Sequence, residues 1–153
     1  MNGATIVSLL SPLVAVGIAV WGFRRASRAD RLRAFFDLQE RYLALEIREG
    51  RKLVHQVVAG RGADEASALA EDLAAKISRT LAVMNSIAIA CEGRFVDKTL
   101  VAEGMGRSFA AAVLAAKPYI DHLESVRGFR PFPFAERLAA DLLRKGYVVG
   151  ARA

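Results

Sequence analysis

A chain of 153 residues with one cysteine and two histidines is long enough for one compact domain and cannot form an internal disulfide. It also has few of the side chains that build metal sites. The formal net charge is +6, of which residues 24–33 supply +4 through five arginines and one aspartate. Binding to anionic lipid head groups, next to an apolar segment, explains this positive charge, and a nucleic-acid partner is not needed to account for it.

The chain opens on an apolar segment. Residues 4–23, ATIVSLLSPLVAVGIAVWGF, contain no ionisable side chain, and a helix of that length spans about 30 Å, the thickness of a bilayer's hydrocarbon core. A cleavable signal peptide would begin with basic residues and end at small ones, whereas this segment ends against arginines. The alternative is a buried helix of a soluble domain, which rarely lacks charge over this length. We predict a transmembrane anchor at residues 1–23.

The residues after the anchor predict its orientation. Because Lys and Arg near a span are retained on the cytoplasmic side, we expect a single-pass protein of the inner membrane. Its N-terminus would lie outside and its C-terminal domain in the cytoplasm. Residues 24–34 form the predicted basic juxtamembrane segment. The predicted lipid-binding residues are Trp21, Arg24, Arg25, Arg28, Arg31 and Arg33.

Helical periodicity without any strand pattern predicts an all-α protein, with a cytoplasmic bundle of four to five segments at residues 35–153. The first predicted helix continues from the anchor over residues 24–59 and ends at Gly60. Its predicted apolar stripe consists of Leu32, Phe36, Leu43, Ile47, Val54 and Val58, with Gln39 and Gly50 between them. A second helix follows an N-cap at Asp64 and ends near Gly93. Its stripe consists of Leu69, Leu73, Ile77, Leu81, Met84 and Ala88.

Cap and turn residues divide the rest of the chain. Asp97 is the predicted N-cap of a third helix, which Pro118 should kink or restart because proline lacks an amide hydrogen. The apolar residues of this helix are Leu100, Phe109, Val113 and Leu114. The stretch RPFPF predicts an extended turn whose Phe132 and Phe134 fill the end of the bundle. A final helix is expected over residues 135–145.

The stretch REGRKLVH, residues 48–55, contains a candidate catalytic pair. Arg48 and His55 lie seven residues apart, two helical turns, and therefore share one face. Histidine would act as general acid and base on a ribose 2′-hydroxyl, and arginine would stabilise the phosphorane. The alternative is a pair of solvated or interfacial side chains. With no phosphate loop or metal-ligand cluster, we predict no cofactor and no metal ion. Cys91, near a helix C-terminus, is predicted to be a small core residue.

The assembled motifs resemble those of small bacterial single-span membrane proteins of unknown function with a cytoplasmic helical domain. These motifs are F-x-x-L-x-x-x-Y at 35–42, L-x-x-x-N-x-I-A at 81–88, E-G at 92–93, D-x-x-L-V at 97–101 and K-P-x-I at 117–120. The spacing of Arg48 and His55 is also similar to the R-x4–6-H motif of HEPN-type ribonucleases. Together with RKLVH at 51–55 after a span, it resembles the HEPN-like membrane accessory protein of type VI-B CRISPR systems, which forms an oligomeric membrane assembly. That resemblance implies that Arg48 and His55 are a degenerate HEPN pair and that the predicted span lines a pore.

The leading functional prediction is a membrane-anchored helical interaction or scaffold module that associates with itself. Small residues let membrane helices approach closely, and they form one stripe along the predicted span. The predicted oligomerisation residues are Thr5, Ser8, Ser11, Ala15, Ala19 and Gly22. Two alternatives stay open: a membrane pore or effector in an antiviral, CRISPR-associated defence system, and a membrane-tethered HEPN-like ribonuclease that needs no metal. A protein or RNA partner is not identified.

Overall fold

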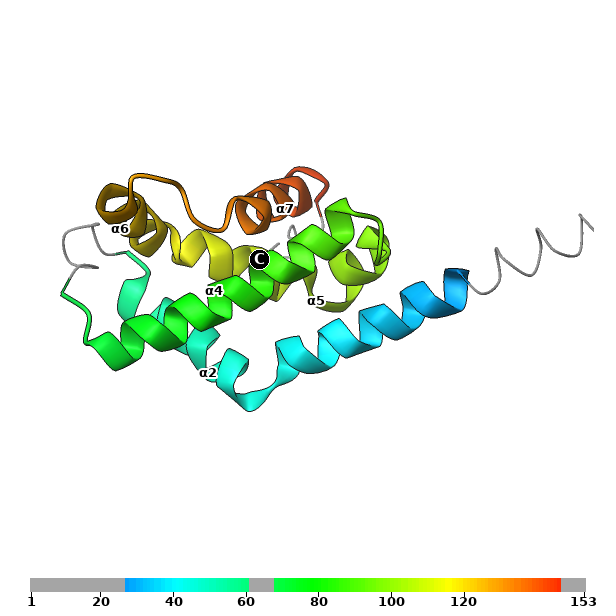
Figure 1. Cartoon of the computed structure of the whole chain (residues 1–153), viewed down its shortest axis with the longest axis horizontal. Helices are drawn as coiled ribbons and strands as arrows, with labels where there is room; N and C mark the ends of the chain where they lie inside the picture. The colour runs from blue at the N-terminus through cyan, green and yellow to red at the C-terminus, as the bar shows by residue number, and fades with distance from the viewer. Residues whose placement is uncertain (1–26, 61–67, 147–153) are drawn as a thin grey trace, which may run out of the picture.

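The computed structural model describes residues 27–60 and 68–146, and every regular element in these ranges is a helix (Figure 1). A first helix covers residues 27–43. The following elements are α2 (Leu45–Leu53), the π-helix η1 (Val54–Val58), α4 (Glu71–Glu92), α5 (Lys98–Ala115), α6 (Lys117–Arg127) and α7 (Pro133–Arg144). The all-α prediction is confirmed for this part of the chain. The anchor predicted at residues 1–23 lies outside the described residues.

The first helix ends earlier than predicted. Helix 27–43 stops at Ala44, whose backbone angles (φ −51°, ψ 142°) are not helical, and α2 begins at the next residue. The N-terminal part of helix 27–43 extends beyond one end of the bundle, its later part lies along the bundle, and α2 packs against α4 (Figure 1). The prediction of one continuous helix over residues 24–59 is wrong. Before the turn, Tyr42 is buried in the main core cluster, and after it α2 packs against α4, so tertiary packing outweighs local helix propensity here.

The packed face of helix 27–43 also differs from the predicted stripe. Phe35 and Tyr42 are buried, with 6% and 1% of their surface exposed. The predicted residues Leu32, Phe36 and Leu43 are instead 45%, 55% and 58% exposed. Residues seven apart share a helical face, so the helix carries two apolar faces, of which the bundle covers one. From α2 onward, the buried residues of the stripe are the predicted ones.

Helix α4 runs through the middle of the bundle and packs against α2, α5 and α7 (Figure 1). Ile77 and Leu81 are fully buried along it, as predicted. The approach of α2 is closest at Gly50, where an added Cβ would lie 1.9 Å from Thr80 Oγ1 and 3.2 Å from the Lys76 carbonyl oxygen. The Thr80 hydroxyl donates a hydrogen bond to that carbonyl at 2.9 Å. Two backbones can approach this closely only because residue 50 has no side chain.

Among the described residues, α4 alone is long and apolar enough to cross a membrane by length and composition. A core helix passes the same test, and α4 carries the charged Lys76 and Arg79 within its length. Because its buried residues pack against three neighbouring helices, we assign α4 to the core of the bundle. The predicted span at residues 4–23 is a separate segment outside the described ranges.

The start of α4 is later than predicted. The helix begins at Glu71 after a non-helical Ala70, so Leu69 precedes the helix although the predicted stripe includes it. The proposed cap Asp64 lies outside the described residues. Glu71 and Asp72 in the first turn supply negative charge at the positive end of the helix dipole, which is how this helix starts without a side-chain cap.

The later helices begin where local signals place them. The Asp97 carboxylate accepts a hydrogen bond from the Thr99 amide at 2.8 Å and caps α5. Pro118 lies in the first turn of α6, which restarts the helical path after Ala116. Of the apolar residues of α5, Leu114 is half exposed, and the buried face of the helix passes through the neighbouring Val113 and through Phe109.

The turn between α6 and α7 is held by charge and by aromatic packing. The Arg130 guanidinium donates to the carboxylates of Asp121, Glu124 and Glu136, and the hydrogen bond to Glu136, the largest cause, raises the pKa of Arg130 above its ordinary value. Phe132 packs against both hydrophobic clusters of the core. The predicted filling of this end of the bundle by aromatic side chains is confirmed for Phe132.

Candidate functional site

The two predicted catalytic residues lie on the surface. Arg48 is exposed on α2, and His55 is exposed in η1. Neither side chain forms a hydrogen bond with another described residue, and neither lines a described hollow of the surface. A π-turn at Val54–Val58 also shifts the helical register near His55. Chemistry at this pair stays a prediction.

A different arginine of the same stretch is held by the fold. The Arg51 guanidinium lies 3.9 Å from the centre of the Tyr42 ring and donates to Ser108 Oγ at 3.3 Å. The Tyr42 hydroxyl also hydrogen-bonds Ser108 Oγ, at 2.9 Å, and its ring stacks on Phe109. These contacts tie helix 27–43 to α2 and α5. The sequence singles out Tyr42 only as part of a motif and gives no sign that Arg51 is its partner.

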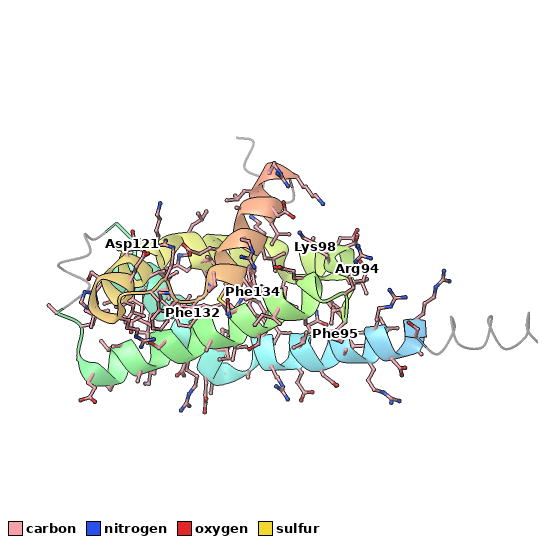
Figure 2. All side chains as sticks on the ribbon, turned by 45° about the horizontal axis from the view of Figure 1, so that its top comes forward. Arg94, Phe95, Lys98, Asp121, Phe132 and Phe134 are labelled. Atoms are coloured by element: carbon pink, nitrogen blue, oxygen red, sulfur yellow. The ribbon has the colours of Figure 1, made fainter. Side chains whose placement is uncertain are left out.

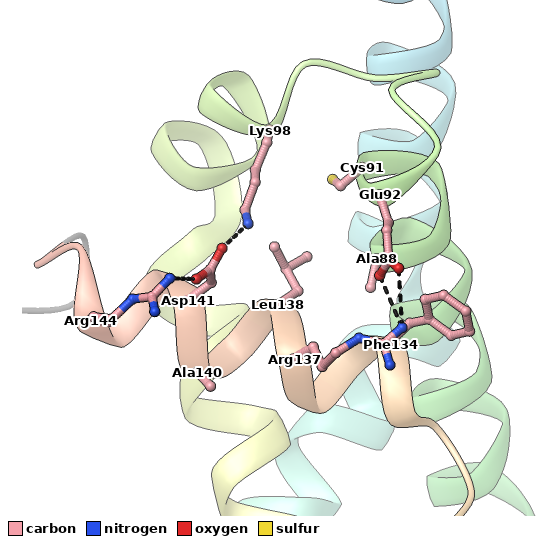
Figure 3. A pocket seen from close by; sticks show the side chains of 10 residues that line it. All are labelled: Ala88, Cys91, Glu92, Lys98, Phe134, Arg137, Leu138, Ala140, Asp141 and Arg144. Carbon is pink, nitrogen blue, oxygen red and sulfur yellow. Dashed lines mark hydrogen bonds and ion pairs between the residues drawn. The ribbon is translucent and has the colours of Figure 1, made fainter.

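A hollow lined by five charged side chains lies where the end of α4, the start of α5 and α7 meet (Figure 3). It encloses about 550 Å³. The Lys98 ammonium and the Arg144 guanidinium both bond the Asp141 carboxylate. On the opposite wall, Arg137 donates to both carboxylate oxygens of Glu92, at 3.0 and 3.2 Å. Cys91, Ala88, Phe134, Leu138 and Ala140 complete the lining.

The charged side chains that line this hollow are paired with one another. Burial is the largest cause that raises the pKa of the Cys91 thiol, to about 11, so the nucleophilic thiolate is scarce at neutral pH. The Lys98 hydrogen bond is the largest cause that lowers the pKa of Asp141, which weakens that carboxylate as a general base. Within residues 27–60 and 68–146, no three His, Cys, Asp or Glu side chains are close enough to bind a metal ion. The ion pairs Lys98–Asp141 and Arg137–Glu92 join α7 to the start of α5 and to the end of α4.

Burial of Cys91 predicts slow alkylation. With a thiol pKa of about 11 in place of 9.0, the thiolate fraction at mildly alkaline pH falls about 100-fold, and burial slows access further. We expect iodoacetamide to modify the folded chain at least about 100-fold more slowly than the chain in denaturant. Ser125→Cys in a Cys91→Ala background is the matched control, because residue 125 is exposed. Equal rates at the two positions would contradict the buried environment of Cys91.

The predicted membrane-facing residues are described in part. Arg28, Arg31 and Arg33 are exposed at the start of helix 27–43, as lipid contact requires. The rest of the predicted lipid-binding set, Trp21, Arg24 and Arg25, lies outside the described residues. The whole predicted oligomerisation set also lies outside them: Thr5, Ser8, Ser11, Ala15, Ala19 and Gly22. For those positions the predictions stand untested.

Residues 9–141 match the family described as "Domain of unknown function (DUF4760)". The matched region begins inside the uncharged segment and extends through most of α7. The family description names neither a membrane protein nor a HEPN-like domain. Comparisons with curated proteins and with solved structures find no match.

Proposed function

This chain belongs to the DUF4760 family, and we propose that it is a membrane-anchored helical interaction module that associates with copies of itself. The observation that carries the proposal is helix 27–43. Its first described residues extend beyond the bundle (Figure 1), Ser27 is four residues from the end of the uncharged segment 4–23, and one apolar face is left uncovered. An anchor in this position would hold all copies in one plane with their projecting helices parallel.

Two further observations support the anchor. The family match starts at residue 9, so residues 9–23, most of the uncharged segment, are part of the family pattern. Arg28, Arg31 and Arg33 are exposed on the first turns of helix 27–43, where an inner leaflet with anionic lipids would attract each of them by about 1 kcal/mol.

Besides the small residues of the proposed span, the uncovered face of helix 27–43 is the second surface through which we propose that copies associate. Leu32, Phe36 and Leu43 are each about half exposed on it, at spacings of four and seven that keep them on one side of the helix. Parallel helices can bury such faces against each other as in a coiled coil. A second copy is the favoured occupant, because copies anchored in the same membrane present this face at the same height.

We expect the full chain to pellet with membranes, to resist alkaline carbonate extraction and to run in detergent as a particle larger than a monomer. Leu32→Gln with Phe36→Gln should shift that particle toward the monomer without unfolding the bundle, because both side chains are already half exposed. Ser8→Leu with Ser11→Leu tests the span in the same way. Arg41→Gln, on the charged side of helix 27–43, is the control and should leave the particle mass unchanged.

The outcomes separate the parts of the proposal. A soluble full-length chain, or one whose first residues are absent after expression in its own host, would contradict the anchor. A monomeric wild-type particle would contradict self-association. A particle unchanged by the Leu32 and Phe36 substitutions but reduced by those at Ser8 and Ser11 would assign association to the span alone.

A further inference from the structure

The loop between α4 and α5 exposes an aromatic ring. Phe95 is 69% exposed, the largest exposed fraction among the large apolar side chains of the described residues. Arg94 beside it is also exposed, whereas Val96 on the other side is buried in the core. Aromatic side chains are enriched at interfaces and at membrane surfaces, so the surroundings of Phe95 decide whether this ring has a binding partner.

The fold holds this loop in one conformation. Arg94 has a φ of 58°, a backbone angle that is unusual for a residue with a side chain. The turn is fixed by hydrogen bonds from the Phe95 amide to the Ala90 carbonyl at 3.0 Å and from the Arg94 amide to the Cys91 carbonyl at 3.2 Å. At Gly93, an added Cβ would lie 2.6 Å from the Phe95 ring. The glycine therefore makes room for the ring in its outward position.

The loop lies beside the start of helix 27–43. Arg94 and Phe95 line one hollow of about 450 Å³ with Ser27, Asp30, Arg31 and Ala34, and both labelled side chains lie on the side of the bundle next to that helix (Figure 2). Ser27 is four residues from Phe23, the last residue of the uncharged segment. Four residues reach at most about 14 Å even when fully extended, so the hollow lies close to the end of the proposed anchor.

The charge at this hollow matches a lipid surface. Arg31 uses its Nε to bond the Ser27 carbonyl at 3.2 Å, and neither Arg31 nor Arg94 forms an ion pair with a described carboxylate. Two guanidinium groups beside an exposed ring combine the interactions that hold a protein in a head-group layer: charge attraction to phosphate and burial of an apolar side chain. A protein partner with an acidic apolar surface is the competing occupant, but nothing else at the hollow favours one.

We propose that the Arg94-Phe95 loop is a second membrane contact, at which Phe95 enters the head-group layer of an anionic bilayer and Arg31 and Arg94 bind lipid phosphates. This inference rests on the proposed anchor. With Ser27 tethered near the bilayer, a tilt of helix 27–43 toward the loop brings Phe95 to the surface, and tilts of about 20° are ordinary for anchored helices. The bundle is then held against the membrane at two points.

The chain's single tryptophan, Trp21, provides a direct test with the full chain in vesicles. Trp21→Phe with Phe95→Trp moves the only tryptophan to the loop. In vesicles that contain phosphatidylglycerol, we expect blue-shifted emission and quenching by lipids brominated high on the acyl chain, both several-fold weaker in pure phosphatidylcholine. Adding Arg31→Gln and Arg94→Gln should reduce the quenching to the phosphatidylcholine level.

Two controls keep the result interpretable. Trp21→Phe with Phe129→Trp carries the probe to another exposed aromatic residue, just after α6. The end of α6 lies at the opposite end of the bundle from the first described residues of helix 27–43 (Figure 1), so this probe should stay accessible to aqueous iodide. Wild-type Trp21 reports the anchor under the same quenchers. If Trp21 is quenched while a tryptophan at position 95 behaves like the one at 129, the loop contact is overturned and the anchor stands. If Trp21 itself is not quenched, the anchor and the loop contact both fail.

Discussion

Gly50→Ala is expected to destabilise the bundle by about 1–3 kcal/mol, because the new methyl group has no room between α2 and α4. Its Cβ would lie 1.9 Å from Thr80 Oγ1 and 3.0 Å from Thr80 Cβ. The Lys76 carbonyl, at 3.2 Å, is main chain and cannot rotate away. Thermal unfolding of the full chain in detergent, followed by circular dichroism, should show a loss of several degrees in midpoint.

Helix propensity alone predicts the opposite sign for this substitution. In an exposed helix, alanine in place of glycine stabilises by about 1 kcal/mol, so a higher midpoint for Gly50→Ala would contradict the close crossing. Glu49→Ala, exposed on the same helix, is the matched control and should change stability by less than about 0.5 kcal/mol. Thr80→Ala removes the Oγ1 atom with which the new methyl group would clash. The loss of stability in the Gly50→Ala, Thr80→Ala double variant should therefore be smaller than the sum of the losses in the two single variants.

Asn85→Ala is expected to lower the free energy of unfolding by about 1–2 kcal/mol, because the Asn85 side chain caps α7, a helix distant in the sequence. Asn85 Oδ1 accepts hydrogen bonds from the amides of Phe134 and Ala135, both at 3.1 Å, in the first turn of α7. Phe132 occupies the N-cap position and has no side-chain acceptor. Without Asn85, two donors in a partly buried helix end lose their partner.

Asn85→Asp is the matched control, because it keeps an acceptor oxygen and places negative charge at the positive end of the helix dipole. We expect it to retain most of the wild-type stability. Hydrogen exchange at the Phe134 and Ala135 amides gives the local readout and should accelerate in Asn85→Ala only. Equal exchange in the two variants would mean that water or another group satisfies these amides.

Sequence patterns predict the elements whose causes are local. The Asp97 cap and the restart at Pro118 follow from residues within one helical turn, so both are predictable and both are confirmed. The break at Ala44 has no local signal, because neither glycine nor proline is near and the flanking residues favour a helix. The break lets Tyr42 pack in the main core cluster while α2 packs against α4, and both contacts join segments that lie far apart in the chain.

The candidate site is harder to predict because its parts come from distant segments. The hollow of Figure 3 joins Glu92, Lys98 and Asp141, which lie in three helices, and no motif links them. The sequence does not predict the Arg94-Phe95 loop as a site either, because folding brings these two residues next to Arg31 from a distant part of the chain. In the sequence, Asn85 is only one residue of the motif L-x-x-x-N-x-I-A. Its role as the hydrogen-bond acceptor at the start of α7 follows from the three-dimensional structure.

The π-turn at Val54–Val58 bears on how relatives of this chain should be aligned. The Ala59 amide bonds the Val54 carbonyl at 3.0 Å, a bond that encloses one residue more than an α-helical turn does. Removing one residue here would leave an ordinary α-helix. A one-residue gap between positions 54 and 58 in a relative therefore marks a regularised helix, and the columns on either side of the gap remain structurally equivalent.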